Sequence, residues 1–162
     1  MGKIIVGMAD FNVCKSPDSL MTLGIGSCVG VIIYDKTTKI SGMAHIMLPS
    51  SEQYKTESGF NRNKFADTAV MDMFNKVLHM GANKATMIAK LAGGAHVFNL
   101  SDSSGSLTVG ERNAAACEDI LKKCAISIVA KDVGGNKGRT IEFLSQTGEL
   151  FIRTIGGPIT RI

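Results

Sequence analysis

Short β-rich segments gathered in runs, with only two helical stretches between them, restrict the fold of this 162-residue chain more than any other feature. Most of these segments end at turn-forming Gly, Asp, Ser or Pro residues, as strands usually do. Six segments fit this description: residues 29–34, 40–48, 85–92, 126–133, 140–144 and 149–155. Because strands and helices do not alternate regularly, the pattern predicts an α+β fold and not a parallel βαβ sheet.

Two helices are predicted, at residues 63–80 and 113–123, from apolar residues that recur every three or four positions. The first has a wide apolar stripe that includes Phe65, Ala69, Met73 and Val77, and Gly81 follows it as a stop signal. No internal repeat or linker interrupts the sequence. We therefore expect residues 1–162 to form a single domain.

Composition and charge argue against several classes of protein. Apolar residues make up 44% of the chain, which is too many for a disordered protein. The net charge of +4 is spread along the sequence, without the basic stripe of a nucleic-acid-binding protein. No apolar run approaches the roughly 20 residues that a membrane helix requires. We therefore expect neither nucleic-acid binding nor membrane insertion.

The chain has four cysteines: Cys14, Cys28, Cys117 and Cys124. The first residues have no apolar core of a signal peptide, which favours a cytoplasmic protein with free thiols. No CxxC pair occurs, and the three His do not fall at zinc-ligand spacing, so no metal site is predicted. Cys117 and Cys124 adjoin the apolar face of the second predicted helix and are expected in the core.

Cys28 follows a glycine-bracketed bend, Gly24-Ile25-Gly26-Ser27, directly before a predicted strand. Successive N–H groups in such a bend can form a concavity that holds an anion, which suits a nucleophilic thiol and a developing oxyanion. The alternative is that Cys28 is a small buried hydrophobic residue at the start of a strand. The bend alone favours this alternative.

His45 follows Cys28 by 17 residues and lies on the next predicted strand. If residues 29–34 and 40–48 pair as a hairpin, the end of the second strand returns beside the start of the first. A hairpin would thus bring His45 close to Cys28, as a nucleophile and its base require. The alternative is a hydrogen-bonded core histidine without a chemical role.

The glycines at positions 24, 26 and 30 superficially resemble a dinucleotide-binding fingerprint. Their spacing is wrong for G-x-G-x-x-G, and a strand follows them where a phosphate-binding helix is required. The sequence also lacks a P-loop pattern. We therefore expect no nucleotide and no other cofactor.

Two stretches stand out as blocks: Thr22-Leu23-Gly24-Ile25-Gly26-Ser27-Cys28-Val29-Gly30-Val31 and Gly42-Met43-Ala44-His45-Ile46-Met47-Leu48-Pro49. They resemble the signature blocks of a known family, the chemoreceptor glutamine deamidases or CheD proteins. The resemblance continues in order through Gly93-Gly94-Ala95, Gly110-Glu111-Arg112-Asn113, Asp132-Val133-Gly134-Gly135, Gly138-Arg139 and Thr147-Gly148. It covers nearly the whole chain.

The resemblance implies an α+β domain with a mixed β-sandwich core flanked by helices, similar to bacterial toxin-type cysteine deamidases. It places the catalytic cysteine, histidine and threonine of the family at Cys28, His45 and Thr22, and it alone identifies Thr22. The backbone at Gly26 and Ser27 is expected to support an oxyanion. The implied reaction is hydrolysis of a glutamine to glutamate through a cysteine thioester, with glutamyl methyl esters as a secondary substrate.

The resemblance also implies partners. Methyl-accepting chemotaxis receptors are the expected substrates, and a CheC-type phosphatase is an expected binding partner. Two alternatives remain open: a regulatory binding module that acts through CheC and receptors, and a cysteine amidase for small molecules. The polar segments 50–62 and 99–110 are expected to frame the site, because exposed loops can contact a partner without disturbing the core.

Overall fold

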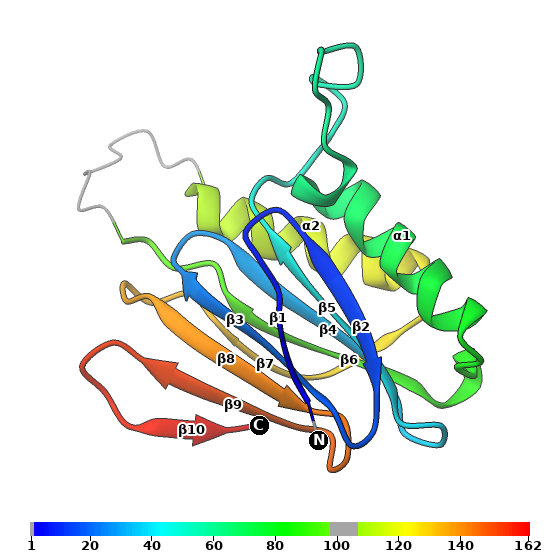
Figure 1. The fold of residues 1–162 in the computed structure, drawn as a ribbon. Coiled ribbons are helices and arrows are strands. Elements are labelled where there is room, and N and C mark those ends of the chain that lie inside the picture. Colours follow the sequence, from blue (N-terminus) through cyan, green and yellow to red (C-terminus); the bar gives the residue numbers. More distant parts are fainter. Residues whose placement is uncertain (1, 98–106) are drawn as a thin grey trace.

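Two five-stranded sheets pack face to face in the computed structural model, which describes residues 2–97 and 107–162 (Figure 1). Sheet one has the spatial order β1 (Lys3–Ile5), β3 (Ser19–Ile25), β8 (Arg139–Leu144), β9 (Glu149–Thr154) and β10 (Ile159–Arg161). Sheet two has the order β2 (Phe11–Lys15), β5 (Ile40–Ile46), β4 (Val29–Asp35), β6 (Met87–Gly93) and β7 (Ser127–Val133). The β1–β3 and β6–β7 pairs are parallel and the other pairs are antiparallel, so both sheets are mixed.

The alternation of side chains along β4 explains how sheet two is buried on both faces. All seven residues of β4 are buried. Val29, Val31 and Ile33 belong to the apolar cluster that also contains the helices, whereas Ile32 and Tyr34 belong to the cluster between the two sheets. Successive residues of a strand point to opposite faces, so one central strand contributes to both cores.

The helices α1 (Ala66–His79) and α2 (Val109–Lys123) both cover the outer face of sheet two (Figure 1). In α1, the buried side chains include Ala69, Met73 and Val77, which lie on the apolar stripe that the sequence predicts. The predicted α+β class is therefore confirmed, as are the mixed sandwich core and the flanking helices. Two single-turn 3₁₀ helices, η1 (Arg62–Lys64) and η2 (Lys84–Thr86), join these elements.

Both helices begin at different residues from those predicted. Residues 63–65 do not belong to α1, because η1 ends at Lys64 and Phe65 is extended, with φ −112° and ψ 141°. The second helix starts earlier than residue 113. Thr108 caps it by accepting from the Glu111 N–H, while the Glu111 side chain accepts from the Thr108 N–H. This capping box was the missed start signal.

The strands β1, β2 and β10 carry no clear alternation and were not predicted. The apolar run before Gly24 proves to be β3, which pairs with β8 but is interrupted by a bulge between Thr22 and Ile25. Gly24 has φ +66°, a left-handed conformation that glycine adopts without strain. Of the segment 99–110 that we expected to frame the site, residues 99–106 lie outside the described residues, and residues 109–110 belong to α2.

Candidate active site

The strands β4 and β5 form the hairpin that the sequence predicts. Their antiparallel register pairs Gly30 with His45. Cys28 comes two residues before Gly30 and packs against the cluster between the sheets, so it lies on the face of sheet two that carries His45. Diagonal neighbours across an antiparallel pair have Cα atoms roughly 7–8 Å apart. The hairpin thus brings the two predicted residues together at one end of the sandwich.

Thr22 reaches His45 from the facing sheet. The Thr22 Oγ1 atom lies 2.7 Å from His45 Nδ1 and also donates to the Val6 carbonyl oxygen at 2.8 Å. A carbonyl oxygen only accepts, so the single hydroxyl hydrogen of Thr22 points to Val6. Thr22 must then accept from His45, which places the hydrogen of a neutral imidazole on Nδ1 and leaves Nε2 with a free lone pair.

His45 is held in its neutral form. Its side chain is almost fully buried, and burial lowers its pKa from the ordinary value because the protein interior disfavours the imidazolium. Among the described residues, no group forms a hydrogen bond with Nε2, although this atom is buried. The unprotonated nitrogen is thus available to a thiol or a water molecule.

Cys28 is half-buried, whereas Cys14, Cys117 and Cys124 are all buried. Burial raises the pKa of the Cys28 thiol, and a hydrogen bond from its own backbone N–H opposes this shift. Desolvation outweighs the backbone donor, so the bend by itself does not favour the thiolate in the free protein. The thiol carries its proton and needs a base when it reacts.

The end of β6 holds the bend before Cys28. The Gly94 N–H donates to the Cys28 carbonyl at 2.7 Å, and the Ala95 N–H donates to the Gly26 carbonyl at 2.9 Å. A side chain at Gly93, where φ is +123°, would collide with the Cys28 carbonyl oxygen. Glycine is thus required at position 93 for the two backbones to come this close.

The Ser27 carbonyl is held by a residue that sequence reasoning did not single out. Asn113 on α2 donates from Nδ2 to Ser27 O and to Met47 O, each at 2.9 Å. Asn113 lies within one of the blocks that carry the family resemblance, and this was the only sequence signal for it. All three carbonyls of Gly26-Ser27-Cys28 are therefore fixed from outside the bend.

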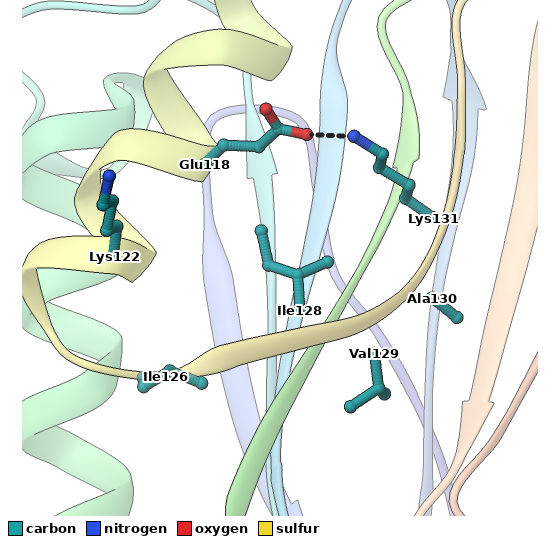
Figure 2. Close-up of a pocket in the computed structure, with 7 residues that line it drawn as sticks. All are labelled: Glu118, Lys122, Ile126, Ile128, Val129, Ala130 and Lys131. Atoms are coloured by element: carbon teal, nitrogen blue, oxygen red, sulfur yellow. Dashed lines mark hydrogen bonds and ion pairs between the residues drawn. The ribbon is translucent and has the colours of Figure 1, made fainter.

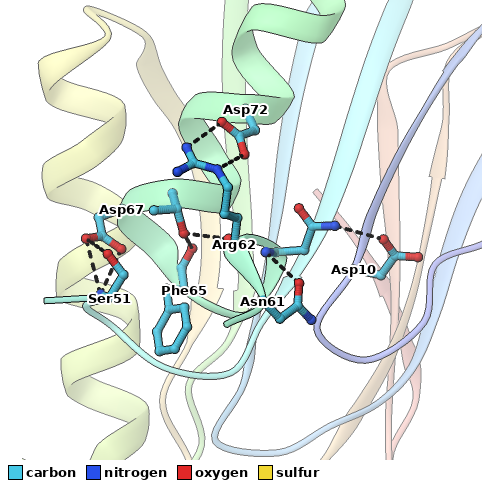
Figure 3. Close-up of polar contacts among 9 residues, drawn as sticks. Asp10, Ser51, Asn61, Arg62, Phe65, Asp67 and Asp72 are labelled. Atoms are coloured by element: carbon cyan, nitrogen blue, oxygen red, sulfur yellow. Dashed lines mark hydrogen bonds and ion pairs between the residues drawn. The ribbon is translucent and has the colours of Figure 1, made fainter. Parts of the chain in front are cut away.

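The segment between β5 and η1 projects beyond the end of sheet two at which β5 finishes (Figure 1). Hydrogen bonds fix its two ends (Figure 3). Ser51 binds both carboxylate oxygens of Asp67 through its N–H, at 3.0 and 3.2 Å, and Arg62 forms a two-bond ion pair with Asp72 at 2.8 and 2.9 Å. Apart from Arg62, which begins η1, this segment contains the residues 50–62 that we expected to frame the site, and it is anchored rather than loosely attached.

A cavity of about 650 Å³ lies between α2 and β7 (Figure 2). Its lining is mostly aliphatic, and Glu118 and Lys131 form an ion pair of 2.7 Å across it. None of Cys28, His45 and Thr22 lines it, and its lining contains no Cys, His, Ser or Thr. The cavity therefore lacks the thiol, imidazole and hydroxyl groups that meet at the end of the β4–β5 hairpin.

No group of three or more His, Cys, Asp or Glu side chains suited to a metal ion occurs in residues 2–97 and 107–162. No helix in the same two ranges is long and apolar enough to cross a membrane. The hairpin end therefore combines a half-buried thiol, a neutral imidazole and a hydroxyl that orients the imidazole, which are the residue types that cysteine-dependent hydrolases use.

Comparison with known proteins identifies the family. The family model described as "CheD chemotactic sensory transduction" matches residues 47–154. A protein from Lachnoclostridium phytofermentans is 48% identical over 163 residues and covers 100% of both chains. One from Caldanaerobacter subterraneus is 50% identical over 157 residues, covering 97% of this chain and 96% of its own. Both bear the name "Probable chemoreceptor glutamine deamidase CheD". The chain belongs to the CheD family.

A solved structure shares the fold. The crystal structure of a Neisseria meningitidis protein of the family DUF152 matches with a TM-score of 0.52, covering 87% of this chain and 75% of its own. The two sequences are 10% identical, so the likeness concerns the fold alone.

Proposed function

We propose that this chain is a glutamine deamidase that converts specific glutamines of methyl-accepting chemotaxis receptors to glutamates in the cytoplasm, through one catalytic domain spanning residues 1–162. Near-complete coverage by relatives of that name supports the substrate class. The observation that carries the chemistry is the Thr22–His45 contact of 2.7 Å, which leaves Nε2 of His45 unprotonated at the hairpin end that bears Cys28.

The first half of the reaction forms a thioester. As the Cys28 sulfur attacks the carboxamide carbon, His45 Nε2 takes the thiol proton, and the carboxamide oxygen becomes an oxyanion. The backbone N–H groups at Ser27 and Cys28, in the bend that begins at Gly26, donate to this oxyanion. The intermediate collapses as His45 returns the proton to the nitrogen, so that ammonia leaves and the C–S bond remains.

The second half releases glutamate. A water molecule attacks the thioester carbon while His45 Nε2 accepts one of its protons, and the C–S bond breaks as the sulfur regains a proton from His45. Thr22 keeps the hydrogen of the neutral ring on Nδ1 and accepts from the imidazolium when it forms. A glutamyl methyl ester reacts by the same steps with methanol as the leaving group, which makes methylesterase activity a secondary reaction.

The substrate glutamines lie on helical bundles in chemoreceptors, so the site has to admit a helix. We propose that segment 50–62 helps to bind the receptor, since it projects at the end of the sandwich where the hairpin presents His45 (Figure 1). A CheC-type phosphatase is proposed to compete for an overlapping surface. A regulatory role through CheC is compatible with catalysis, and Cys28→Ala separates the two because it removes the nucleophile and leaves this surface unchanged.

The decisive experiment incubates the purified protein with receptor cytoplasmic fragments and maps Gln-to-Glu changes by mass spectrometry. We expect deamidation by the native protein and none by folded Cys28→Ala. Cys117→Ala is the matched control: it removes a buried thiol from the core between the helices and sheet two, costs about 1–2 kcal/mol of stability and retains activity. Full activity of Cys28→Ala would exclude the proposed mechanism, and hydrolysis of free glutamine at the rate of receptor glutamine would favour a small-molecule amidase.

A further inference from the structure

One side-chain amide joins the two backbone segments that carry the proposed nucleophile and base. Asn113 Nδ2 donates both of its hydrogens, one to Ser27 O and one to Met47 O, each at 2.9 Å. Ser27 directly precedes Cys28, and Met47 lies two residues beyond His45. Asn113 is fully buried, so water does not compete for these hydrogen bonds.

The bond to Ser27 determines the direction of a backbone N–H. In a trans peptide the C=O and the N–H point in opposite directions. Holding the Ser27 carbonyl towards α2 therefore turns the Cys28 N–H away from α2. The Ala95 N–H acts in the same way on the Gly26 carbonyl, and so orients the Ser27 N–H. Within the described residues, neither N–H donates to a backbone carbonyl, and the Cys28 N–H faces its own thiol, beside which the substrate oxygen develops its charge.

The helix that carries Asn113 is itself tightly seated. A side chain at Gly110, in the first turn of α2, would lie 2.5 Å from the Gly94 carbonyl oxygen and 2.6 Å from the Ala95 carbonyl oxygen. The start of α2 is therefore pressed against the same end of β6 that binds the bend. Asn113 Oδ1 is buried without a donor among the described residues, so the NH₂ group is the half of the amide that the structure uses.

We infer that Asn113 is a positioning residue for the reaction. It fixes the plane of the Ser27–Cys28 peptide so that the Cys28 N–H donates to the developing oxyanion, and it holds this bend against the strand that ends beyond His45. This role rests on the deamidase activity proposed above. Asn113 touches neither the substrate nor the reacting atoms, and it acts through the backbone of Cys28.

The test measures kcat and KM for receptor deamidation with Asn113→Ala and Asn113→Ser. Alanine removes both hydrogen bonds, whereas the serine hydroxyl has one hydrogen and can satisfy one carbonyl at most. Ser145→Ala is the matched control, because Ser145 is also fully buried and its side chain bonds Cys14 and Ser41 within the sandwich. Circular dichroism gives the folded fraction of each variant, and Cys28→Ala is assayed in parallel.

We expect kcat of Asn113→Ala to fall about 10- to 100-fold, since loss of one oxyanion donor costs roughly 100- to 1,000-fold and a misaligned donor retains part of its effect. KM should stay within about threefold, Asn113→Ser should fall between Asn113→Ala and the native protein, and Ser145→Ala should keep its kcat. A kcat within threefold of native in folded Asn113→Ala, or a loss confined to KM, overturns the role. If neither Asn113 variant folds while Ser145→Ala does, Asn113 is structural and the role is equally overturned.

The parallel assay separates this inference from the function on which it rests. If Cys28→Ala is inactive while both Asn113 variants work at the native rate, the deamidase mechanism stands and only the positioning role fails. If Cys28→Ala still deamidates the receptor, the proposed mechanism fails and the role of Asn113 fails with it.

Discussion

The substitution Thr22→Val tests the link between the two sheets at the site. Valine has nearly the shape of threonine and suits a strand, so the change removes a hydroxyl without leaving a cavity. Two buried groups then lose their partner: His45 Nδ1, which donates to Thr22 at 2.7 Å, and the Val6 carbonyl, which accepts from it at 2.8 Å.

Both the stability and the rate should fall. An unsatisfied buried polar group costs about 1–3 kcal/mol, so we expect the two groups together to cost at least about 2 kcal/mol and to lower the Tm by at least about 4–8 °C. The bond to His45 matters most when the ring is an imidazolium, and hydrogen bonds to charged groups contribute about 1.5–3 kcal/mol. Each 1.36 kcal/mol is a tenfold change in rate, which predicts that kcat of Thr22→Val falls roughly 10- to 150-fold.

The assay is receptor deamidation measured well below the Tm of the variant, with Thr22→Ser as the control that keeps the hydroxyl. Nitrogen-15 NMR of the imidazole should show the hydrogen on Nδ1 in the native protein and a shift towards Nε2 in Thr22→Val. Native kcat in folded Thr22→Val, or a native ring carrying its hydrogen on Nε2, would refute the orientation of His45 described above.

Three further predictions concern protonation. Because burial raises the pKa of the Cys28 thiol, the rate of its alkylation by iodoacetamide should still increase above pH ~8.5. Cys28 should nevertheless be alkylated faster than Cys14, which is buried. A rate of Cys28 alkylation that reaches a plateau below pH ~8 would contradict the raised pKa. Since the pKa of His45 is lowered, kcat/KM should hold down to pH ~6.5 and fall only below it, and an acid limb centred above pH 7 would exclude His45 as the base. At the far end of β4, burial raises the pKa of Asp35, but hydrogen bonds from Thr86, the Asn83 N–H and Thr38 together outweigh burial and lower this pKa. The Asp35 carboxylate takes up a proton more readily in the unfolded chain than in the folded one, so ionised Asp35 stabilises the fold above pH ~4. Asp35→Asn should therefore lower the free energy of unfolding by about 2 kcal/mol at pH 7 and by less at pH 3, with kcat unchanged.

The hairpin could be predicted because its pairing is local. The β-rich segments that became β4 and β5 are separated by one polar turn, and their alternation sets which side chains share a face. Cys28 and His45 are therefore neighbours that periodicity alone can bring together. The six β-rich segments and two helices were found because the composition and periodicity of each are local as well, with errors only at their ends.

Thr22 and Asn113 could not be derived from periodicity, because each meets the hairpin through a contact between layers. Thr22 lies on β3 of the facing sheet, 23 residues before His45, and only the family resemblance identified it. Asn113 comes from α2, 86 residues beyond Ser27, and its buried amide resembles any polar residue in an amphipathic helix. The protonation state of Cys28 was likewise beyond the sequence, because it depends on how deeply the bend is buried.

The contact between Thr22 and His45 makes the orientation of the imidazole depend on the interface between the two sheets. The thiol and the imidazole belong to sheet two, and the hydroxyl that sets the imidazole belongs to sheet one. A displacement of one sheet against the other by the length of a single hydrogen bond would leave every strand intact. It would nevertheless break the Thr22–His45 hydrogen bond that orients the imidazole. The orientation of the His45 ring therefore depends on the alignment of the two sheets.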